Sequence, residues 1–191
     1  MKRSTHSIAG PSSATMSAMN KDAGEIRLER IVSGGQTGVD RGALDAAKAL
    51  GIPHGGWCPR GRLAEDGTIP LGYELRETPS SDYPVRTEQN VIDSDGTLIL
   101  FRDRLFGGTE LTRRLCVKHG RPVLTIDLAG EVDAESVVRW IDEHAIRVLN
   151  VAGPRESSAP GIGEEAMQMI CQLFSGRGGG GVSKARKSTA G

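Results

Sequence analysis

Short apolar runs alternate with helical patterns between residues 28 and 174, and this alternation constrains the fold more than any other feature. The segments that read as strands are 28–33, 52–58, 97–101, 122–126 and 147–151. The segments with helical spacing are 39–50, 84–93, 109–119, 133–144 and 162–174. Strands that alternate with helices favour parallel pairing, because each helix carries the chain back across the sheet. The sequence therefore predicts an α/β fold, with a doubly wound, mainly parallel sheet covered by helices on both faces.

The segment between 59 and 82 interrupts the alternation of strands and helices. It is rich in glycine, proline and charged residues and shows no long apolar run, so we expect a long loop there. Loops of this length in a compact domain are usually binding loops or disordered segments.

The two ends of the chain differ from the middle in composition. Residues 1–24 are rich in serine, alanine and threonine, and residues 175–191 are rich in glycine and basic residues, so both are predicted to be disordered extensions. The predicted ligand-binding domain is a single unit, 25–174. The ends hold seven of the 24 basic residues and only one of the 24 acidic residues, which leaves the domain with a net charge of −6. An acidic domain argues against nucleic-acid binding.

Cysteine content and hydropathy indicate the cellular compartment and whether the chain can bind a metal or a membrane. The three cysteines, Cys58, Cys116 and Cys171, are far apart in the sequence and give neither a disulfide framework nor a metal-ligand spacing. No apolar run approaches the ~20 residues of a membrane span. We therefore expect a cytoplasmic protein that does not associate with membranes and holds no metal through its own side chains.

Glycine-rich turns follow two of the predicted strands, and each opens a predicted helix. The first contains Gly34, Gly35 and Gly38, and the second is Gly107-Gly108-Thr109. Glycines let backbone N–H groups approach an anion, and the positive end of a helix dipole adds to the attraction. Either turn alone is also compatible with a tight connection that binds nothing. Two of them at the carboxyl edge of one sheet indicate a phosphate-bearing ligand.

The basic residues of the domain support an anionic ligand. Of its 17 basic side chains all but Lys48 and Lys118 are arginine, whose planar fork matches phosphate and carboxylate oxygens. Arg60 and Arg86 are the preferred ligand contacts, and several of the other arginines are expected to be solvated surface charges paired with acidic residues.

The strongest motif is SGGQTGVDRGALD at 33–45, and it resembles the molybdenum cofactor carrier protein family. Further matches are GWCPRG at 56–61, RTEQNV at 86–91, SDGTLI at 94–99, GGT at 107–109 and NVAGPRES at 150–157. The resemblance implies a Rossmann-like fold related to the lysine-decarboxylase-like phosphoribohydrolases and to the DNA-processing protein A domain. It also implies homo-oligomers, either dimers or tetramers, and a role in holding molybdenum cofactor, a pterin with a phosphate tail.

Together the turns and the matched motifs give the predicted ligand-binding residues. They are Gly34, Gly35, Gln36, Thr37, Gly38, Asp40, Arg41, Arg60, Arg86, Asn90, Gly107, Gly108 and Thr109. No catalytic residue is predicted among them.

Three functions of different classes stay open. They are a carrier of molybdopterin or a related nucleotide, a nucleoside-monophosphate phosphoribohydrolase, and a nucleotide-sensing module. The phosphoribohydrolases that the chain resembles have Gly-Gly-x-Gly-Thr-x-x-Glu, in which the glutamate assists glycosidic cleavage. Here Thr112 stands where that glutamate is expected, and Glu110 lies at another position on the helix. The sequence therefore favours binding over catalysis.

Overall fold

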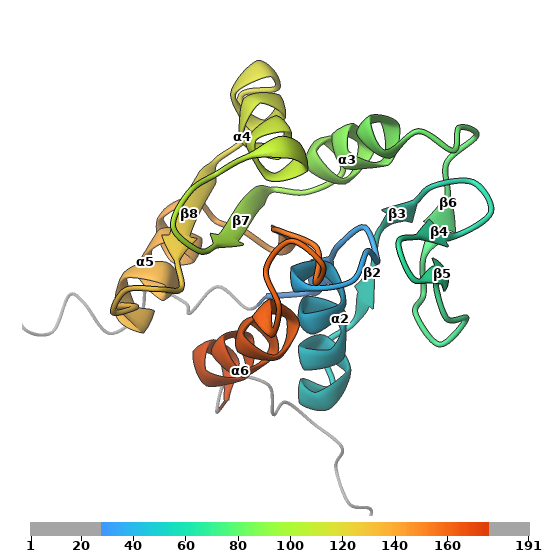
Figure 1. Cartoon of the computed structure of the whole chain (residues 1–191). Coiled ribbons are helices and arrows are strands. Elements are labelled where there is room, and N and C mark those ends of the chain that lie inside the picture. The colour runs from blue at the N-terminus through green and yellow to red at the C-terminus, as the bar shows by residue number, and fades with distance from the viewer. Residues whose placement is uncertain (1–27, 176–191) are drawn as a thin grey trace, which may run out of the picture.

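The computed structural model describes residues 28–175, in which a parallel sheet lies between two layers of helices (Figure 1). The extensions predicted at 1–24 and 175–191 lie outside the described residues, apart from Ser175. The main sheet has five strands in the order β2-β1-β9-β7-β8. Their bounds are β1 Arg30–Val32, β2 His54–Gly55, β7 Gly96–Phe101, β8 Val123–Asp127 and β9 Val148–Ala152. Every pairing among them is parallel, which confirms the predicted α/β fold class.

Strand β7 is the centre of the core. It pairs with β9 on one side and β8 on the other, and Leu98, Ile99 and Leu100 are fully buried. Side chains on successive strand positions point to opposite faces, so a continuous apolar run fits a strand with helices on both sides. This burial accounts for the unbroken hydrophobic run in the sequence.

The five helices within residues 28–175 form two groups on opposite faces of the sheet. The larger core cluster joins α2 (Val39–Leu50), α5 (Ala134–Glu143) and α6 (Ile162–Phe174) to the strands. A smaller cluster joins α3 (Tyr83–Ile92) and α4 (Gly107–Lys118), and Figure 1 shows these two helices on the other side of the sheet. Within residues 28–175 no helix is long and apolar enough to span a membrane.

Local sequence explains where several helices begin and end. Helix α2 ends at Gly51, whose backbone adopts the left-handed conformation with φ 67°, as expected for glycine after a helix. Asp133 precedes α5 and accepts hydrogen bonds from the N–H groups of Glu135 and Ser136. Pro84 stands in the first turn of α3, where its missing N–H costs no hydrogen bond.

The segment 52–82 differs from the expectation of one strand followed by a loop. The predicted strand is divided at Gly56 (φ 125°) into β2 and β3 (Trp57–Cys58), and β3 pairs with β6 (Arg76–Glu77) in a separate small sheet. A Cβ atom at Gly56 would overlap the carbonyl oxygen of Ser33, so close packing against β1 requires glycine at this bend.

The predicted loop also contains a small antiparallel hairpin, formed by β4 (Leu63–Ala64) and β5 (Gly67–Thr68). Beneath it, the buried side chain of Arg62 donates to the carbonyl oxygens of Ile69, Pro70, Tyr73 and Leu75. One arginine therefore satisfies the backbone acceptors that regular secondary structure leaves unpaired in this segment.

Candidate ligand-binding site

A cavity of about 450 Å³ opens at the carboxyl edge of the sheet, where β9 and β7 lie side by side. The chain leaves β9 toward α6 on one face of the sheet and leaves β7 toward α4 on the other. The divergence of these connections produces a crevice, which is the usual ligand position in open α/β sheets. The lining comes from four segments: Gln36 and Asp40; Tyr83, Pro84, Arg86 and Thr87; Phe106, Gly107, Gly108, Thr109, Leu111 and Thr112; and Ala152, Gly153, Pro154, Arg155, Ser157 and Ser158.

The N-terminus of α4 forms one wall of the cavity. The N–H groups of Thr109 and Glu110 donate to the carbonyl oxygen of Phe106. The N–H groups of Gly107 and Gly108 lie in the first turn of the helix, where no intrahelical acceptor is available. A Cβ atom at Gly108 would have no protein atom within 4 Å. Gly108 therefore leaves open space beside free N–H donors at the positive end of a helix dipole, an arrangement suited to an anion.

A buried ion pair lies across the cavity from this helix end. The Arg86 Nη1 atom donates to Asp40 Oδ2 at 3.0 Å, and the Gln36 N–H donates to the same oxygen at 3.3 Å. Burial raises the pKa of the Asp40 carboxyl above its ordinary value, and the Arg86 guanidinium acts in the opposite direction. Gly34 makes this pairing possible, because a Cβ atom there would overlap the Arg86 guanidinium.

Two residues that line the cavity each have a buried donor atom without an acceptor among the described residues: Gln36 Nε2 and Arg86 Nε. The orientation of the Gln36 amide is fixed, because its oxygen accepts from the N–H groups of Thr37 (3.0 Å) and Glu65 (2.9 Å). Its nitrogen therefore cannot gain a partner by an amide flip. Buried polar groups are almost always hydrogen-bonded, so the two donors indicate a missing acceptor at this place.

The first glycine turn is closed by contacts within the protein. The N–H groups of Gln36, Thr37 and Val39 donate to Asp40, to the Gln36 side chain and to the Pro154 carbonyl. Gly35 and Gly38 both have φ of 76°. A Cβ atom would meet the Leu75 side chain at Gly35 and the Pro154 carbonyl at Gly38. The glycines of this turn thus allow close packing, and of its residues only Gln36 reaches the cavity.

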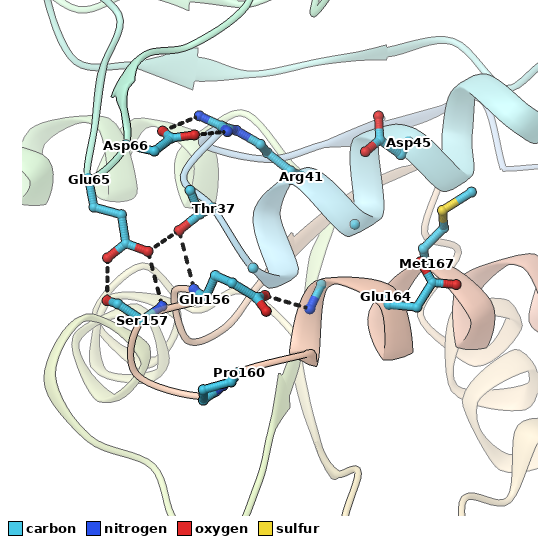
Figure 2. Close-up of a pocket in the computed structure, with 13 residues that line it drawn as sticks. Thr37, Arg41, Asp45, Glu65, Asp66, Glu156, Ser157, Pro160, Glu164 and Met167 are labelled. Carbon is cyan, nitrogen blue, oxygen red and sulfur yellow. Dashed lines mark hydrogen bonds and ion pairs between the residues drawn. The ribbon is translucent and has the colours of Figure 1, made fainter.

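Thr37 and Arg41 line a second hollow, of about 690 Å³, between the hairpin, α2 and the start of α6 (Figure 2). The Arg41 guanidinium forms a two-pronged ion pair with Asp66, and its Nε atom also donates to the Gly35 carbonyl. The hydrogen bonds with Asp66 raise the pKa of Arg41 and lower that of Asp66. Arg41 is therefore already neutralised within the protein.

Arg60 and Asn90 do not line either hollow. The Arg60 side chain is exposed, and its backbone N–H donates to the Ser80 carbonyl. The Asn90 amide accepts from the Trp57 N–H at 2.8 Å and donates to the Trp57 carbonyl at 2.9 Å. Asn90 therefore pairs with the β3 backbone much as a neighbouring strand does.

Sequence reasoning missed several residues that line the cavity. Tyr83 and Phe106 are 37% and 44% exposed, and Arg155 and Ser157 come from the loop after β9. The NVAGPRES motif was a usable signal for Arg155 and Ser157, because it follows a strand at the carboxyl edge. Nothing in the local sequence identified the two aromatic rings as cavity residues, because their proximity to the cavity depends on how α3 and α4 pack.

Two glutamates near these segments are engaged elsewhere. Glu110 accepts hydrogen bonds from Arg113 and Arg114 on its own helix, which lower its pKa to about 2. Glu88 pairs with Lys118 and His119 between α3 and α4, and these contacts lower its pKa. Neither lines the cavity, so Asp40 is the acidic side chain there.

Among residues 28–175, no group of three or more histidine, cysteine, aspartate or glutamate side chains is placed to hold a metal ion. The buried thiols of Cys58 and Cys116 have pKa values raised by burial, which makes them poor metal ligands and weak nucleophiles.

The fold is that of a Rossmann-like protein, and the cavity lies at the switch point of its sheet. The chain belongs to the circularly permutated YpsA SLOG family, whose model matches residues 31–174. The strand order agrees with that description: if the main strands are counted from β9, the order becomes 3-2-1-4-5, that of a classic doubly wound sheet.

One solved structure from Syntrophus aciditrophicus SB, named "Putative molybdenum carrier protein", is 46% identical to the chain. It matches with a TM-score of 0.74 and covers 77% of this chain and 94% of its own. No curated protein matches the chain significantly.

Proposed function

We propose that the protein is a carrier that binds a phosphate-bearing ligand in the cavity between β9 and β7, and that this ligand is molybdenum cofactor or a related pterin or nucleotide. The observation that carries the proposal is that Gln36 and Arg86, each with a buried donor without an acceptor, line the same cavity as the open N-terminus of α4. The name of the structure from Syntrophus aciditrophicus supports the choice of ligand class.

The phosphate is assigned to the end of the cavity formed by α4. The N–H groups of Gly107 and Gly108 supply donors, and the helix dipole supplies partial positive charge. Arg155, which is half exposed at the cavity, supplies a full positive charge. A phosphate offers several acceptor oxygens, so it accepts from all of these groups at once.

The flat ring of the ligand is assigned to the mouth, where Tyr83 and Phe106 are partly exposed. Aromatic side chains stack on planar heterocycles, and ligand pockets typically combine such surfaces with a few polar groups. The edge of a pterin or purine carries both donors and acceptors. Asp40 offers acceptor oxygens and the Gln36 amide offers a donor, so the interior of the cavity complements such an edge. Molybdenum itself is cargo, held by the sulfurs of the pterin.

Carriage is favoured over hydrolysis by the position of the acidic groups. The Thr112 hydroxyl donates to the Gly108 carbonyl, and a neutral hydroxyl cannot stabilise the positive charge that glycosidic cleavage develops on the ribose. Glu110 is neutralised by two arginines on its own helix. The observation that keeps the phosphoribohydrolase as a second candidate is Asp40, a carboxylate in the cavity that is already paired with Arg86. The nucleotide-sensing function gains no separate support from the site.

The experiment is a titration of purified protein with molybdopterin, compared between two glycine variants. Gly108→Val places a branched side chain in the open space at the helix end, and we expect the affinity to fall at least about tenfold. Gly72→Val is the matched control: Gly72 lies on a surface loop, and a Cβ atom there comes no closer than 3.7 Å to the Lys48 ammonium. Equal affinity of the two variants, with both folded, would place the ligand elsewhere.

A further inference from the structure

The carboxylate of Glu65 lies in a site formed by several hydrogen-bond donors. Glu65 is at the tip of the hairpin between β4 and β5, and its two oxygens accept from Thr37 Oγ1, from Ser157 Oγ and, at 3.1 Å, from the Ser157 N–H. Arg155 Nη1 lies 3.7 Å from the same carboxylate. Figure 2 shows Thr37 and Ser157 converging on Glu65. An anion on a surface hairpin is thus bound by three hydrogen-bond donors and one guanidinium.

These donors belong to the ligand-binding edge of the fold. Thr37 follows β1, and Arg155 and Ser157 follow β9, whereas Glu65 comes from the hairpin outside the main sheet. Ser157 lines both hollows, and Arg155 lines the smaller one. The donor set is therefore adjacent to the cavity assigned to the ligand and continuous with it.

The hairpin tip is also connected to the cavity through Gln36. The Gln36 side-chain oxygen accepts from the Glu65 N–H, and its nitrogen is a buried donor without a partner among the described residues. The same side chain therefore lines the cavity and holds the hairpin tip.

We propose that Thr37, Arg155 and Ser157 form a subsite for a second phosphate, which a diphosphate-bearing nucleotide ligand carries and a pterin with a single phosphate lacks, and that Glu65 occupies this subsite while the protein is empty. The exchange conserves hydrogen bonds, because phosphate oxygens accept from the same donors that the carboxylate leaves. A phosphate also carries more negative charge than one carboxylate, which strengthens its attraction to Arg155. The proposal relies on the proposed function only for the position of the rest of the ligand.

The surroundings permit the movement. The Glu65 side chain is 18% exposed and that of Asp66 is 48% exposed, so the tip lies at the surface. The base of the hairpin is fixed by Arg62, and Asp66 stays tethered to Arg41. Of the other carboxylates that line this hollow, Glu156 accepts hydrogen bonds from the N–H groups of Gly161 and Gly163 at the start of α6. Withdrawal of Glu65 therefore removes the negative charge that blocks the donors.

The experiment is a titration of the full chain with inorganic phosphate, followed through backbone amide signals by NMR. The Ser157 amide reports on the subsite, and the Gly108 amide reports on the cavity. Glu65→Ala removes the resident carboxylate, and we expect the phosphate concentration that half-saturates the Ser157 shift to fall about tenfold or more, as for any site freed from an internal competitor. Adding Thr37→Val, which removes one donor without lining the cavity, is expected to reverse this gain.

The two proposals fail in different ways. The subsite proposal is overturned if the phosphate concentration that half-saturates the Ser157 shift is the same in the natural chain and in Glu65→Ala. It is also overturned if the Ser157 signal does not shift at all. Absence of a phosphate shift at Gly108, whatever happens at Ser157, counts against the proposed cavity alone. A circular dichroism spectrum and a melting curve for each variant establish that the core is intact, so that a missing shift reports on binding.

Discussion

Glycine has two distinct roles at the carboxyl edge of this sheet. In the turn after β1, Gly35 and Gly38 allow left-handed backbone and close packing, and Gly34 gives room to the Arg86 guanidinium. At the start of α4, Gly108 faces open space. Both turns look alike in the sequence. Only the structure distinguishes them, because it shows whether protein atoms or open space surround the position that a Cβ atom would occupy.

Gly34→Ala tests whether the position of Arg86 matters for binding. The new methyl group would overlap the end of a flexible side chain, so we expect the fold to persist while Arg86 moves away from Asp40. Loss of a charge-assisted hydrogen bond of about 1.5–3 kcal/mol predicts at least about a tenfold loss of affinity for molybdopterin. The measurement is a binding titration beside a melting curve, with Gly130→Ala, at an open surface turn, as the control. Unchanged affinity would show that Arg86 does not contact the ligand.

At the residue scale, the sequence predicted the parts of the site that are local. Gln36, Asp40, Arg86 and the 107–109 turn line the cavity, because each is close in sequence to a strand end or a helix start. Their roles in binding stay predictions. Glu65 was not predicted as part of any site, because its partners are 28 and 92 residues away along the chain.

At the scale of elements, the contact between α2 and α6 depends on glycine. A Cβ atom at Gly42 in α2 would overlap the carbonyl oxygen of Gly163 in α6, and backbone atoms cannot move aside as a flexible side chain can. The closeness of these helices also positions the loop after β9, which lines the cavity. Packing of small residues between two helices therefore contributes to the geometry of the site.

Gly42→Ala is expected to lower the free energy of unfolding by about 1–3 kcal/mol, because overpacking outweighs the gain in helix propensity. The measurement is equilibrium unfolding in urea. Gly108→Ala is the matched control: it is also a helical glycine, yet its Cβ has open space, so we expect no loss of stability. Similar stability for both variants would mean that α2 and α6 separate at little cost.

The hairpin is expected to loosen in acid before the core unfolds. Burial acts to raise the pKa of Glu65, but hydrogen bonds from Ser157 and Thr37 outweigh it and leave the pKa below 4.5. The hydrogen bond from Arg41 lowers the pKa of Asp66 below 3.8. A lowered folded-state pKa means that each carboxylate contributes stability at higher pH and loses it as the pH falls through the lowered value.

NMR signals of the 63–68 amides and of Ser157 provide the measurement for this acid transition. We expect them to shift together below the ordinary carboxylate values, while signals from β7 persist. Glu65→Gln removes the titrating carboxylate of Glu65, so the change in the hairpin signals with pH should be smaller in this variant. Hairpin signals that change only when those of β7 also change would contradict the expectation.

The elements themselves were predictable to different degrees. The helices at 39–50 and 162–174 agree with α2 and α6 at both ends, because apolar stripes and a terminal glycine define them. The strands of 59–82 were not predictable, since each spans only two residues and the buried Arg62 that supports them has no periodic signal.

At the scale of the whole molecule, the order of the strands is what positions the site. Alternation along the sequence predicts a parallel sheet but carries no information on which strands are neighbours. The last strand, β9, lies in the middle of the sheet beside β1 and β7, and this insertion creates the crevice. This strand order agrees with the description of the family as circularly permutated.

The same arrangement predicts little hydrolysis of nucleoside monophosphates. Glu110 faces its own arginines, and Asp40 is engaged by Arg86, so no acidic group in the cavity is free to stabilise a ribosyl cation. A positioned acid or base typically supplies ~10²–10⁴-fold, and we expect only trace release of free base without one. The assay is a panel of nucleoside monophosphates with detection of the base. Release at ordinary enzyme rates that Asp40→Asn abolishes would favour the hydrolase.

The central claim, that the cavity beside β9 and β7 carries a phosphate-bearing pterin, is tested most directly by identifying what the protein holds. The measurement is mass spectrometry of the small molecules released from purified protein, with molybdenum determined in the same samples. We predict a pterin phosphate in the natural chain and in Gly72→Val, and its loss in Gly108→Val, where the helix end is blocked. Samples without any pterin, or with equal amounts in the two variants, would contradict the account.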